Sequence, residues 1–356
     1  MGERVLMKGN EAMSEAAIQA GCMVYFGYPI TPQNEVASYM AKKMPLEGRV
    51  YLQAEAEVAA INMVLGAASA GVRAMTSSSS PGISLKTEGI SYIAGSDLPC
   101  LIANVQRGGP GLGGIQPSQA DYFQAVKAPG HGDLHLIVFA PASVQELVTS
   151  VYEAFDLSDK YRVPAMILSD GMLGQMMEPV DFPEPKAASG LPEKTWATNG
   201  TKEQRKPNIT NSLFLEPHEL EDKILARYQR YALIERDEVR YETFMTEDAE
   251  IVLVAYGSAA RVSKAAVKAA RAKGIKVGLL RPITLWPFPK KAIAAVAAKC
   301  KAMLTVELSM GQMVEDVRLA VNGVCPVEFY GRTGGVIATP EEVLQQIEKM
   351  AGGENK

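Results

Sequence analysis

The sequence predicts an α/β protein of two domains joined by a charged segment. Short apolar runs alternate with helical patterns over 1–171 and again over 248–356, the apolar runs lack a regular polar alternation, and prolines interrupt residues 172–247. Alternating strands and helices favour a parallel sheet with helices on both faces, whose buried strands are continuously apolar. A chain of 356 residues is long enough for two such domains.

Each domain has its own series of expected elements. In the larger domain, strands are expected at 23–26, 49–52, 72–76, 101–105, 134–139 and 164–168, with helices near 9–20, 33–44, 55–70, 83–95, 118–128 and 143–159. In the smaller domain, strands are expected at 251–255, 276–280, 302–306 and 327–329, with helices at 259–273, 288–299, 311–322 and 340–350.

The middle segment, 172–247, has a different character. Its prolines break any long element, and only 218–242 has a helical pattern, which is densely charged. We expect a linker that lies across surfaces and contains one exposed or domain-bridging helix.

Composition excludes several classes of function. The net charge of −4 gives no electrostatic footprint for nucleic acid or an anionic membrane, and no apolar stretch is long enough to span a bilayer. The four cysteines are scattered without CxxC spacing, so neither a zinc site nor an iron–sulfur cluster is expected on this chain. Unpaired cysteines and a charged, leaderless beginning suggest the cytoplasm.

A stiff turn follows the first expected strand. Tyr28-Pro29-Ile30-Thr31-Pro32 contains two prolines, which hold φ at their own positions and favour extended conformations before them. Open α/β sheets bind ligands at the carboxyl ends of strands, so the Thr31 hydroxyl is a candidate ligand group. The alternative is that Thr31 only caps the following helix.

A second candidate is Glu57, in Glu55-Ala56-Glu57 at the start of an almost wholly apolar helix. Acidic residues are common at helix N-termini, which is the simpler explanation. However, a carboxylate at the mouth of a buried helix faces other protein groups rather than water, which suits proton sharing with a basic nitrogen. We therefore expect Glu57 to be catalytic and Glu55 at most to support it.

Two further turns follow expected strands. Arg107 precedes a glycine-rich stretch, Gly108 to Gly114, and is suited to bind a carboxylate; its spacing to the next helix does not fit a dinucleotide-binding motif. The alternatives there are a surface charge and a flexible loop. The run Thr76 to Gly82 contains four serines before Pro81, and it suits either a bound anion or heterocycle or a simple turn.

These motifs, in this order, resemble the α subunit of multi-subunit 2-oxoacid:ferredoxin oxidoreductases, most of all the branched-chain (3-methyl-2-oxobutanoate) type. Leu-Arg-Pro-Ile-Thr-Leu-Trp-Pro-Phe-Pro at 280–289 and Val-Glu-Leu-Ser-Met-Gly-Gln at 306–312 strengthen the resemblance. It implies a thiamine-diphosphate-binding fold: a pyrimidine-type domain over 1–171, the linker, and a transketolase C-terminal-like domain over 248–356.

The resemblance also implies a cofactor site divided between chains. Thiamine diphosphate would be shared with a β subunit, while Mg²⁺ and [4Fe-4S] clusters would lie on partner subunits and no metal on this chain. Ser169-Asp170-Gly171 resembles part of a diphosphate signature without its asparagine, which agrees with this division. Subunits γ and ferredoxin-like δ, ferredoxin as electron acceptor and coenzyme A as co-substrate complete the expected system.

Residue roles follow from the same resemblance. Glu57 would hydrogen-bond N1′ of the aminopyrimidine. Arg107 and the Thr31 hydroxyl would hold the substrate carboxylate. The cofactor would also contact Tyr28, Pro29, Ser80 and Gly82.

Two alternatives remain open at the level of sequence. The acid oxidised could be 2-oxoglutarate or pyruvate; a basic residue near the far end of the substrate would favour 2-oxoglutarate. The chain could also be a non-catalytic scaffold of such a complex, against which Thr31, Glu57 and Arg107 argue.

Overall fold

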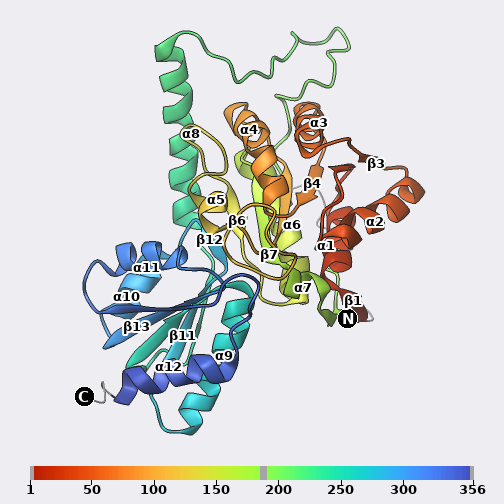
Figure 1. Cartoon of the computed structure of the whole chain (residues 1–356). Coiled ribbons are helices and arrows are strands. Elements are labelled where there is room, and N and C mark those ends of the chain that lie inside the picture. Colours follow the sequence, from red (N-terminus) through yellow and green to blue (C-terminus); the bar gives the residue numbers. More distant parts are fainter. Residues whose placement is uncertain (1–3, 185–190, 353–356) are drawn as a thin grey trace.

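The larger sheet contains seven strands in the order β12-β6-β7-β5-β4-β2-β3 (Figure 1). The computed structural model describes residues 4–184 and 191–352. Six strands of this sheet are parallel: β2 (Val24–Gly27), β3 (Val50–Gln53), β4 (Ala74–Ser78), β5 (Leu101–Gln106), β6 (Ile137–Phe139) and β7 (Ala165–Asp170). Residues of β4, β5 and β7 are buried throughout, as expected of strands covered on both faces.

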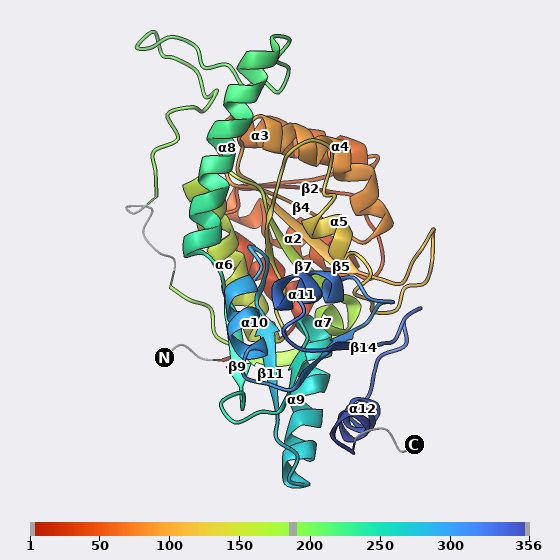
Figure 2. The same ribbon diagram turned by 90° about the vertical axis from the view of Figure 1, so that its left-hand side faces the viewer.

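Two groups of helices cover this sheet (Figure 2). On one side, α1 (Gly9–Gln19) packs on α2 (Asn34–Lys43) and α6 (Val144–Tyr161); on the other, α3 (Glu57–Ser69) packs on α4 (Pro81–Gly95). A short helix, α5 (Tyr122–Val126), follows the glycine-rich loop. Because the strands are parallel, the turns after β2, β3, β4, β5 and β7 all meet at one edge of the sheet.

The smaller sheet has the order β14-β13-β10-β11-β9. Its parallel strands are β10 (Ile251–Val254), β11 (Val277–Pro282), β13 (Ala302–Glu307) and β14 (Val327–Gly331), and β9 (Tyr241–Phe244) is antiparallel. Helices α9 (Gly257–Ala272) and α12 (Pro340–Gly352) pack together, as do α10 (Lys290–Ala297) and α11 (Met313–Val321).

Most of the expected strands and helices are present, with some differences at their ends. The helix expected at 118–128 covers only Tyr122–Val126, and the strand expected at 134–139 covers only Ile137–Phe139. Turn residues on either side, including Pro117 and Asp133, shorten both elements.

The middle segment contains more structure than a linker with one helix. It includes α7 (Gly171–Gln175), β8 (Met177–Val180), which pairs with β1 (Val5–Lys8), and β9. The helix is α8 (Pro217–Asp237), five residues shorter than expected at its end. These edge strands are short and partly exposed, so their sequences carry little hydrophobic signal.

One segment crosses between the expected domains. β12 (Thr284–Trp286), in the range assigned to the smaller domain, pairs with β6 at the edge of the larger sheet. Trp286 stacks on His135 at 4.6 Å and contacts Tyr231 of α8, which lies along the larger domain (Figure 1). In the described part of the chain, no helix is both long and apolar enough to cross a membrane.

Candidate functional site

The Tyr28–Pro32 turn lies at the ligand-binding edge of the larger sheet. Tyr28 and Thr31 are half-buried and Pro29 is exposed. The Thr31 hydroxyl accepts a hydrogen bond from the Asn34 side chain at 3.2 Å. Since α2 begins at Asn34 and its N-cap is Gln33, Thr31 is not the helix cap.

Glu57 occupies the first turn of α3, and the residue as a whole is 6% exposed. Gly82 lies against it: a Cβ added at Gly82 would be 2.1 Å from Ser78 Oγ and 2.7 Å from Glu57 Oε1. No hydrogen bond to this carboxylate exists among the described residues. Buried carboxylates normally have partners, so Glu57 is poised for a donor from outside this chain. Glu55, by contrast, is exposed.

A buried lysine accompanies Glu57. Lys86 is one turn after Gly82 on α4, is fully buried, and donates hydrogen bonds to Thr76 Oγ1 at 2.7 Å and the Ser77 carbonyl at 3.0 Å. Burial lowers its pKa to about 7, while the nearby charge of Glu57 opposes that shift. Sequence reasoning missed this residue, because the polar neighbours Ser84, Thr87 and Glu88 make Lys86 resemble an ordinary exposed lysine.

Arg107 connects the turn after β2 to the glycine-rich loop after β5. Its guanidinium donates to the Thr31 carbonyl through Nη1 at 2.9 Å and to the Leu112 carbonyl through Nη2 at 3.1 Å. The structure thus brings Arg107 and Thr31 together. Arg107 is a buried residue that joins two loops by hydrogen bonds and is not a surface charge. Its Nε is buried without a hydrogen-bond partner among the described residues, which leaves a donor for an acidic ligand.

A network around Ser80 connects the serine turn to Arg107. Ser80 Oγ accepts from the Arg107 N–H at 3.0 Å and donates to Asp121 Oδ2 at 2.6 Å, and Asn104 donates to the same oxygen at 2.9 Å. Burial raises the pKa of Asp121, while the hydrogen bonds from Ser80 and Asn104 oppose it. Sequence reasoning missed Asp121; its place one residue before the start of α5 was the available sign.

The remaining polar groups at this edge divide into structural and unpartnered ones. Asp170 caps α7 by accepting from the backbone N–H groups of Met172 and Leu173, which is a structural role. The Ser78 and Ser79 hydroxyls are buried and unpartnered in the described structure. No cluster of three or more potential metal ligands occurs among residues 4–184 and 191–352.

A cavity of about 400 Å³ opens beside Thr31. Its walls come from the turn after β2, the loop after β5, the start of α7 and the loop before α12, and neither lysine nor arginine is among its described lining residues. Its lining side chains include Thr31, Glu35, Ile115, Pro117, Met172 and Ile337.

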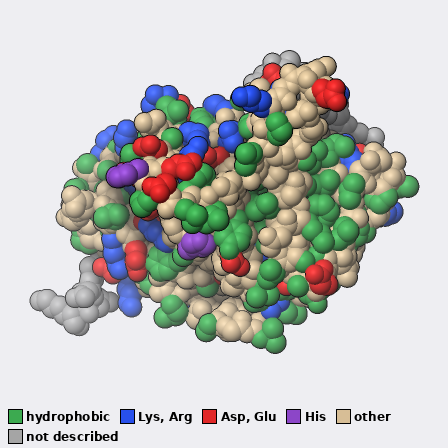
Figure 3. Space-filling model, turned by 90° about the horizontal axis from the view of Figure 1, so that it is seen from above, with side chains coloured by type: hydrophobic (Ala, Val, Ile, Leu, Met, Phe, Trp, Pro, Cys, Tyr) green, Lys and Arg blue, Asp and Glu red, His purple; other side chains and the backbone are tan. Residues whose placement is uncertain are grey.

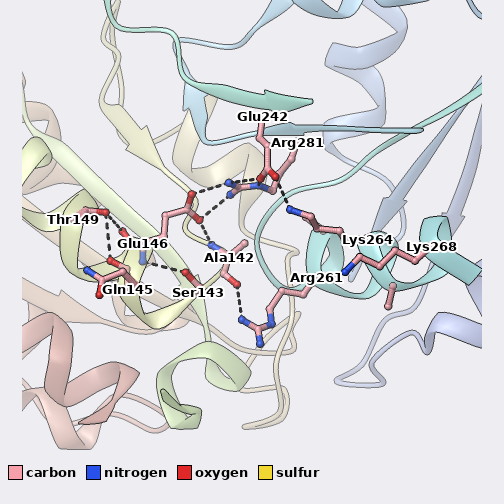
Figure 4. A pocket seen from close by; sticks show the side chains of 12 residues that line it. Ala142, Ser143, Gln145, Glu146, Thr149, Glu242, Arg261, Lys264, Lys268 and Arg281 are labelled. Carbon is pink, nitrogen blue, oxygen red and sulfur yellow. Dashed lines mark hydrogen bonds and ion pairs between the residues drawn. The ribbon is translucent and has the colours of Figure 1, made fainter. Parts of the chain in front are cut away.

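A larger cavity, about 590 Å³, lies between α6 and α9 (Figure 4). None of the predicted site residues lines it. Its Arg281 side chain forms two hydrogen bonds with Glu146, at 2.7 and 2.8 Å, and a third with Glu242. Lys264 also pairs with Glu242. These cations are neutralised by ion pairs, so the cavity is a domain junction rather than an obvious ligand site.

The edge near Glu57 fits an aminopyrimidine cofactor. It combines a buried carboxylate that lacks a donor, a glycine at which a side chain would fill the space beside that carboxylate, and unpartnered hydroxyls at Ser78 and Ser79. A flat heterocycle with ring nitrogens and an amino group supplies the complementary donors and acceptors.

Two family models together match residues 15–343 of the chain. The model for pyruvate flavodoxin/ferredoxin oxidoreductase, thiamine-diphosphate-binding, matches residues 15–248, and that for pyruvate:ferredoxin oxidoreductase core domain II matches 249–343. The chain belongs to the 2-oxoacid:ferredoxin oxidoreductase family. The predicted fold, a thiamine-diphosphate-binding domain followed by a smaller α/β domain, is therefore confirmed.

Individual members of this family are similar over their whole length. Ketoisovalerate oxidoreductase subunit VorB of Methanothermobacter marburgensis is 52% identical, with 98% of this chain and 99% of that protein covered. 2-Oxoglutarate synthase subunit KorA of Methanothermobacter thermautotrophicus is 37% identical, with 98% and 100% covered. The predicted class, a subunit of a thiamine-diphosphate-dependent 2-oxoacid:ferredoxin oxidoreductase of several subunits, is confirmed, and the 52% identity to a ketoisovalerate oxidoreductase subunit supports the branched-chain type.

A solved structure shares the fold. The 2-oxoglutarate:ferredoxin oxidoreductase from Magnetococcus marinus, with 2-oxoglutarate, coenzyme A and succinyl-CoA bound, superimposes with a TM-score of 0.84 at 29% identity. The match covers 98% of this chain and 65% of that longer chain.

Proposed function

We propose that this oxidoreductase subunit supplies the aminopyrimidine half of a shared thiamine diphosphate site and oxidises 3-methyl-2-oxobutanoate. The observation that carries the site assignment is the buried Glu57 carboxylate without a hydrogen-bond partner in the described structure. Thiamine diphosphate, when bound there, would supply the nucleophilic and electron-accepting chemistry that decarboxylation of a 2-oxoacid requires.

Glu57 would hold and exchange the proton at N1′ of the aminopyrimidine. Its position in a largely buried site limits contact with water, and Gly82 leaves the space that a ring requires. Ser80, through the Pro81–Gly82 turn, and Tyr28 and Pro29, at the end of β2, would line the same site.

Arg107 and Thr31 would hold the substrate carboxylate. The Arg107 Nε is available for a charge-assisted hydrogen bond, and the Thr31 backbone is already fixed by Nη1 of the same guanidinium. Binding of the carboxylate would orient the 2-oxo carbon for attack.

The cavity beside Thr31 favours a branched-chain substrate over 2-oxoglutarate. Its apolar walls include Ile115, Met172 and Ile337, which suit an isopropyl group. Among its described lining residues Glu35 is the charged one, and Lys8 lies 3.8 Å from its carboxylate, outside the lining. A second substrate carboxylate would therefore find no cation in the cavity wall. Pyruvate would leave these walls without contacts.

A partner subunit would cover the outer face of α3 and α4. After Glu57, α3 has no charged residue, yet Val58 is 44% exposed and Leu85 of α4 is 55% exposed. Figure 3 shows mostly apolar and uncharged side chains over this end of the molecule. Such a face fits a β subunit that brings the diphosphate half of the site close to Glu57.

The remaining components belong to the same proposal. Mg²⁺ and [4Fe-4S] clusters would reside on the β and δ subunits, with a γ subunit, coenzyme A as acyl acceptor and ferredoxin as electron acceptor. A cytoplasmic location fits four free cysteines.

The Glu57→Ala variant tests the site assignment. In the reconstituted complex we expect loss of at least about 100-fold in 2-oxoacid-dependent acceptor reduction, with assembly retained, because a proton-transfer group is removed. Glu55→Ala, which removes an exposed carboxylate two residues away, is the matched control and should keep activity near wild type. Near-normal turnover of Glu57→Ala would refute the assignment.

A panel of 2-oxoacids tests the substrate. We expect kcat/KM for 3-methyl-2-oxobutanoate to exceed that for 2-oxoglutarate by at least about tenfold. Introducing a cation by Met172→Arg should lower this ratio. A higher kcat/KM for 2-oxoglutarate in the wild type would overturn the substrate assignment and leave the assignment of Glu57 intact.

A further inference from the structure

Ser80 has a backbone conformation that a side chain makes unfavourable. Its φ is 25° and its ψ is −83°, in a region that glycine adopts far more readily than serine. The residue is buried and immediately precedes Pro81 and Gly82, the cradle of Glu57. A strained serine where glycine would be relaxed indicates that the hydroxyl has a use that offsets the strain.

The hydroxyl connects three separate elements. It accepts from the Arg107 N–H at the end of β5 and donates to Asp121, the N-cap residue of α5; the Arg107 carbonyl is also 3.2 Å away. Asn104 closes the ring, since its Oδ1 accepts from the Ser80 N–H at 3.1 Å and its Nδ2 donates to Asp121.

Further hydrogen bonds connect this network of Ser80, Asn104 and Asp121 to the sheet. The Asp121 N–H donates to Gln106 Oε1 at 3.1 Å, and the Gln106 amide donates to the Ser169 carbonyl at 3.2 Å on the neighbouring strand β7. The backbone at Arg107 is therefore held from the Ser80 turn on one side and from the sheet on the other.

We propose that Ser80 and Asp121 are positioning residues that hold Arg107 in register with the Glu57 cradle. This inference rests on the proposed role of Arg107 in binding the substrate carboxylate. The Ser80 turn continues into Gly82 beside Glu57, while its hydroxyl fixes the Arg107 backbone. The distance between the Arg107 and Glu57 side chains, which come from different elements of the fold, is thereby fixed.

The test uses Ser80→Gly in the reconstituted complex. Glycine relaxes the backbone but removes the hydrogen bonds of the Ser80 hydroxyl to Arg107 and Asp121, so these two effects on the unfolding midpoint should largely offset each other. The KM for 3-methyl-2-oxobutanoate should rise about tenfold, with a smaller change in kcat. Hydrogen exchange of the Arg107 amide should accelerate, because its acceptor is gone. Asp121→Asn, which retains the side-chain size, should raise KM in the same direction.

Asn322→Gly is the matched control. Asn322 also has a positive φ, 48°, but is exposed at the end of α11. Its replacement should relax the backbone in the same way and leave KM unchanged.

A double-mutant cycle separates this inference from the proposed function. If Ser80 acts through Arg107, Ser80→Gly should cost nothing further in an Arg107→Ala background. An equal cost in both backgrounds, or an unchanged KM in Ser80→Gly while Arg107→Ala raises it, overturns the positioning role alone. An unchanged KM in Arg107→Ala itself overturns the proposed substrate-binding role.

Discussion

At the scale of single residues, the site is defined by polar groups that the protein leaves unsatisfied. The Nε of Arg107 and the hydroxyls of Ser78 and Ser79 are buried without hydrogen-bond partners in the described chain, and Glu57, a buried residue beside them, has no hydrogen bond to its carboxylate there. Each such group costs stability, so their clustering at one sheet edge indicates a ligand that completes them. Lys86 differs, because it has partners and a depressed pKa.

Lys86 makes stability depend on pH. The pKa of Lys86 falls from 10.5 in the unfolded reference to about 7 in the folded chain, so between these values the unfolded chain binds more protons and stability rises with pH. Lys86→Met should remove up to about 1.4 kcal/mol per pH unit of this slope. Urea unfolding at pH 7.5, 8.5 and 9.5 measures it, with exposed Lys268→Met as control. Parallel slopes for Lys86→Met and wild type would contradict this prediction.

At the scale of elements, close packing of α3 on α4 determines where Glu57 lies. Gly82 and Gly89 of α4 face α3, and a Cβ at Gly89 would be 2.4 Å from Ile61 Cγ2. The two glycines let the helices approach so closely that the start of α3 meets the start of α4. The apolar sequence of α3 fits this burial on one side and the proposed partner surface on the other.

The packing can be tested with two alanine substitutions. Gly89→Ala should destabilise by about 1–3 kcal/mol, because the new methyl group overlaps Ile61. Gly66→Ala on α3 is the matched control: its Cβ meets nothing within 4 Å, so the higher helix propensity of alanine should stabilise by about 0.5–1 kcal/mol. Thermal unfolding compares them, and equal effects of both substitutions would refute the close approach.

At the scale of the whole molecule, a strand and a largely buried ion pair connect the two domains. β12 leaves the smaller domain to extend the larger sheet, and Arg281 of β11 pairs with Glu146 of α6 across the junction (Figure 4). The Arg281 side chain is 9% exposed, so its ion pairs are largely shielded from water. The smaller domain also contributes Ile337, from the loop before α12, to the lining of the Thr31 cavity.

Arg281→Leu should weaken this junction. Removing the guanidinium leaves Glu146 in a half-buried place without its bidentate partner, at an expected cost of about 3 kcal/mol. Lys301→Ala breaks an exposed pair with Glu250 and should cost less than about 1 kcal/mol. Denaturant unfolding of both variants measures the difference. A loss for Arg281→Leu no larger than that for Lys301→Ala would show that the junction depends on β12 instead.

Sequence alone determined the parallel larger sheet and three of the turns that carry the site, because apolar runs, prolines and glycines act locally and parallel strands end at a common edge. It thereby indicated Thr31, Glu57 and Arg107 as candidates, whose catalytic roles stay predictions. Only the tertiary structure decided that Lys86 is buried near Glu57, that Asp121 accepts a hydrogen bond from Ser80, and that β12 joins the larger sheet. These contacts join residues far apart in the chain, and their side chains leave no periodic pattern, so only the packed molecule specifies them.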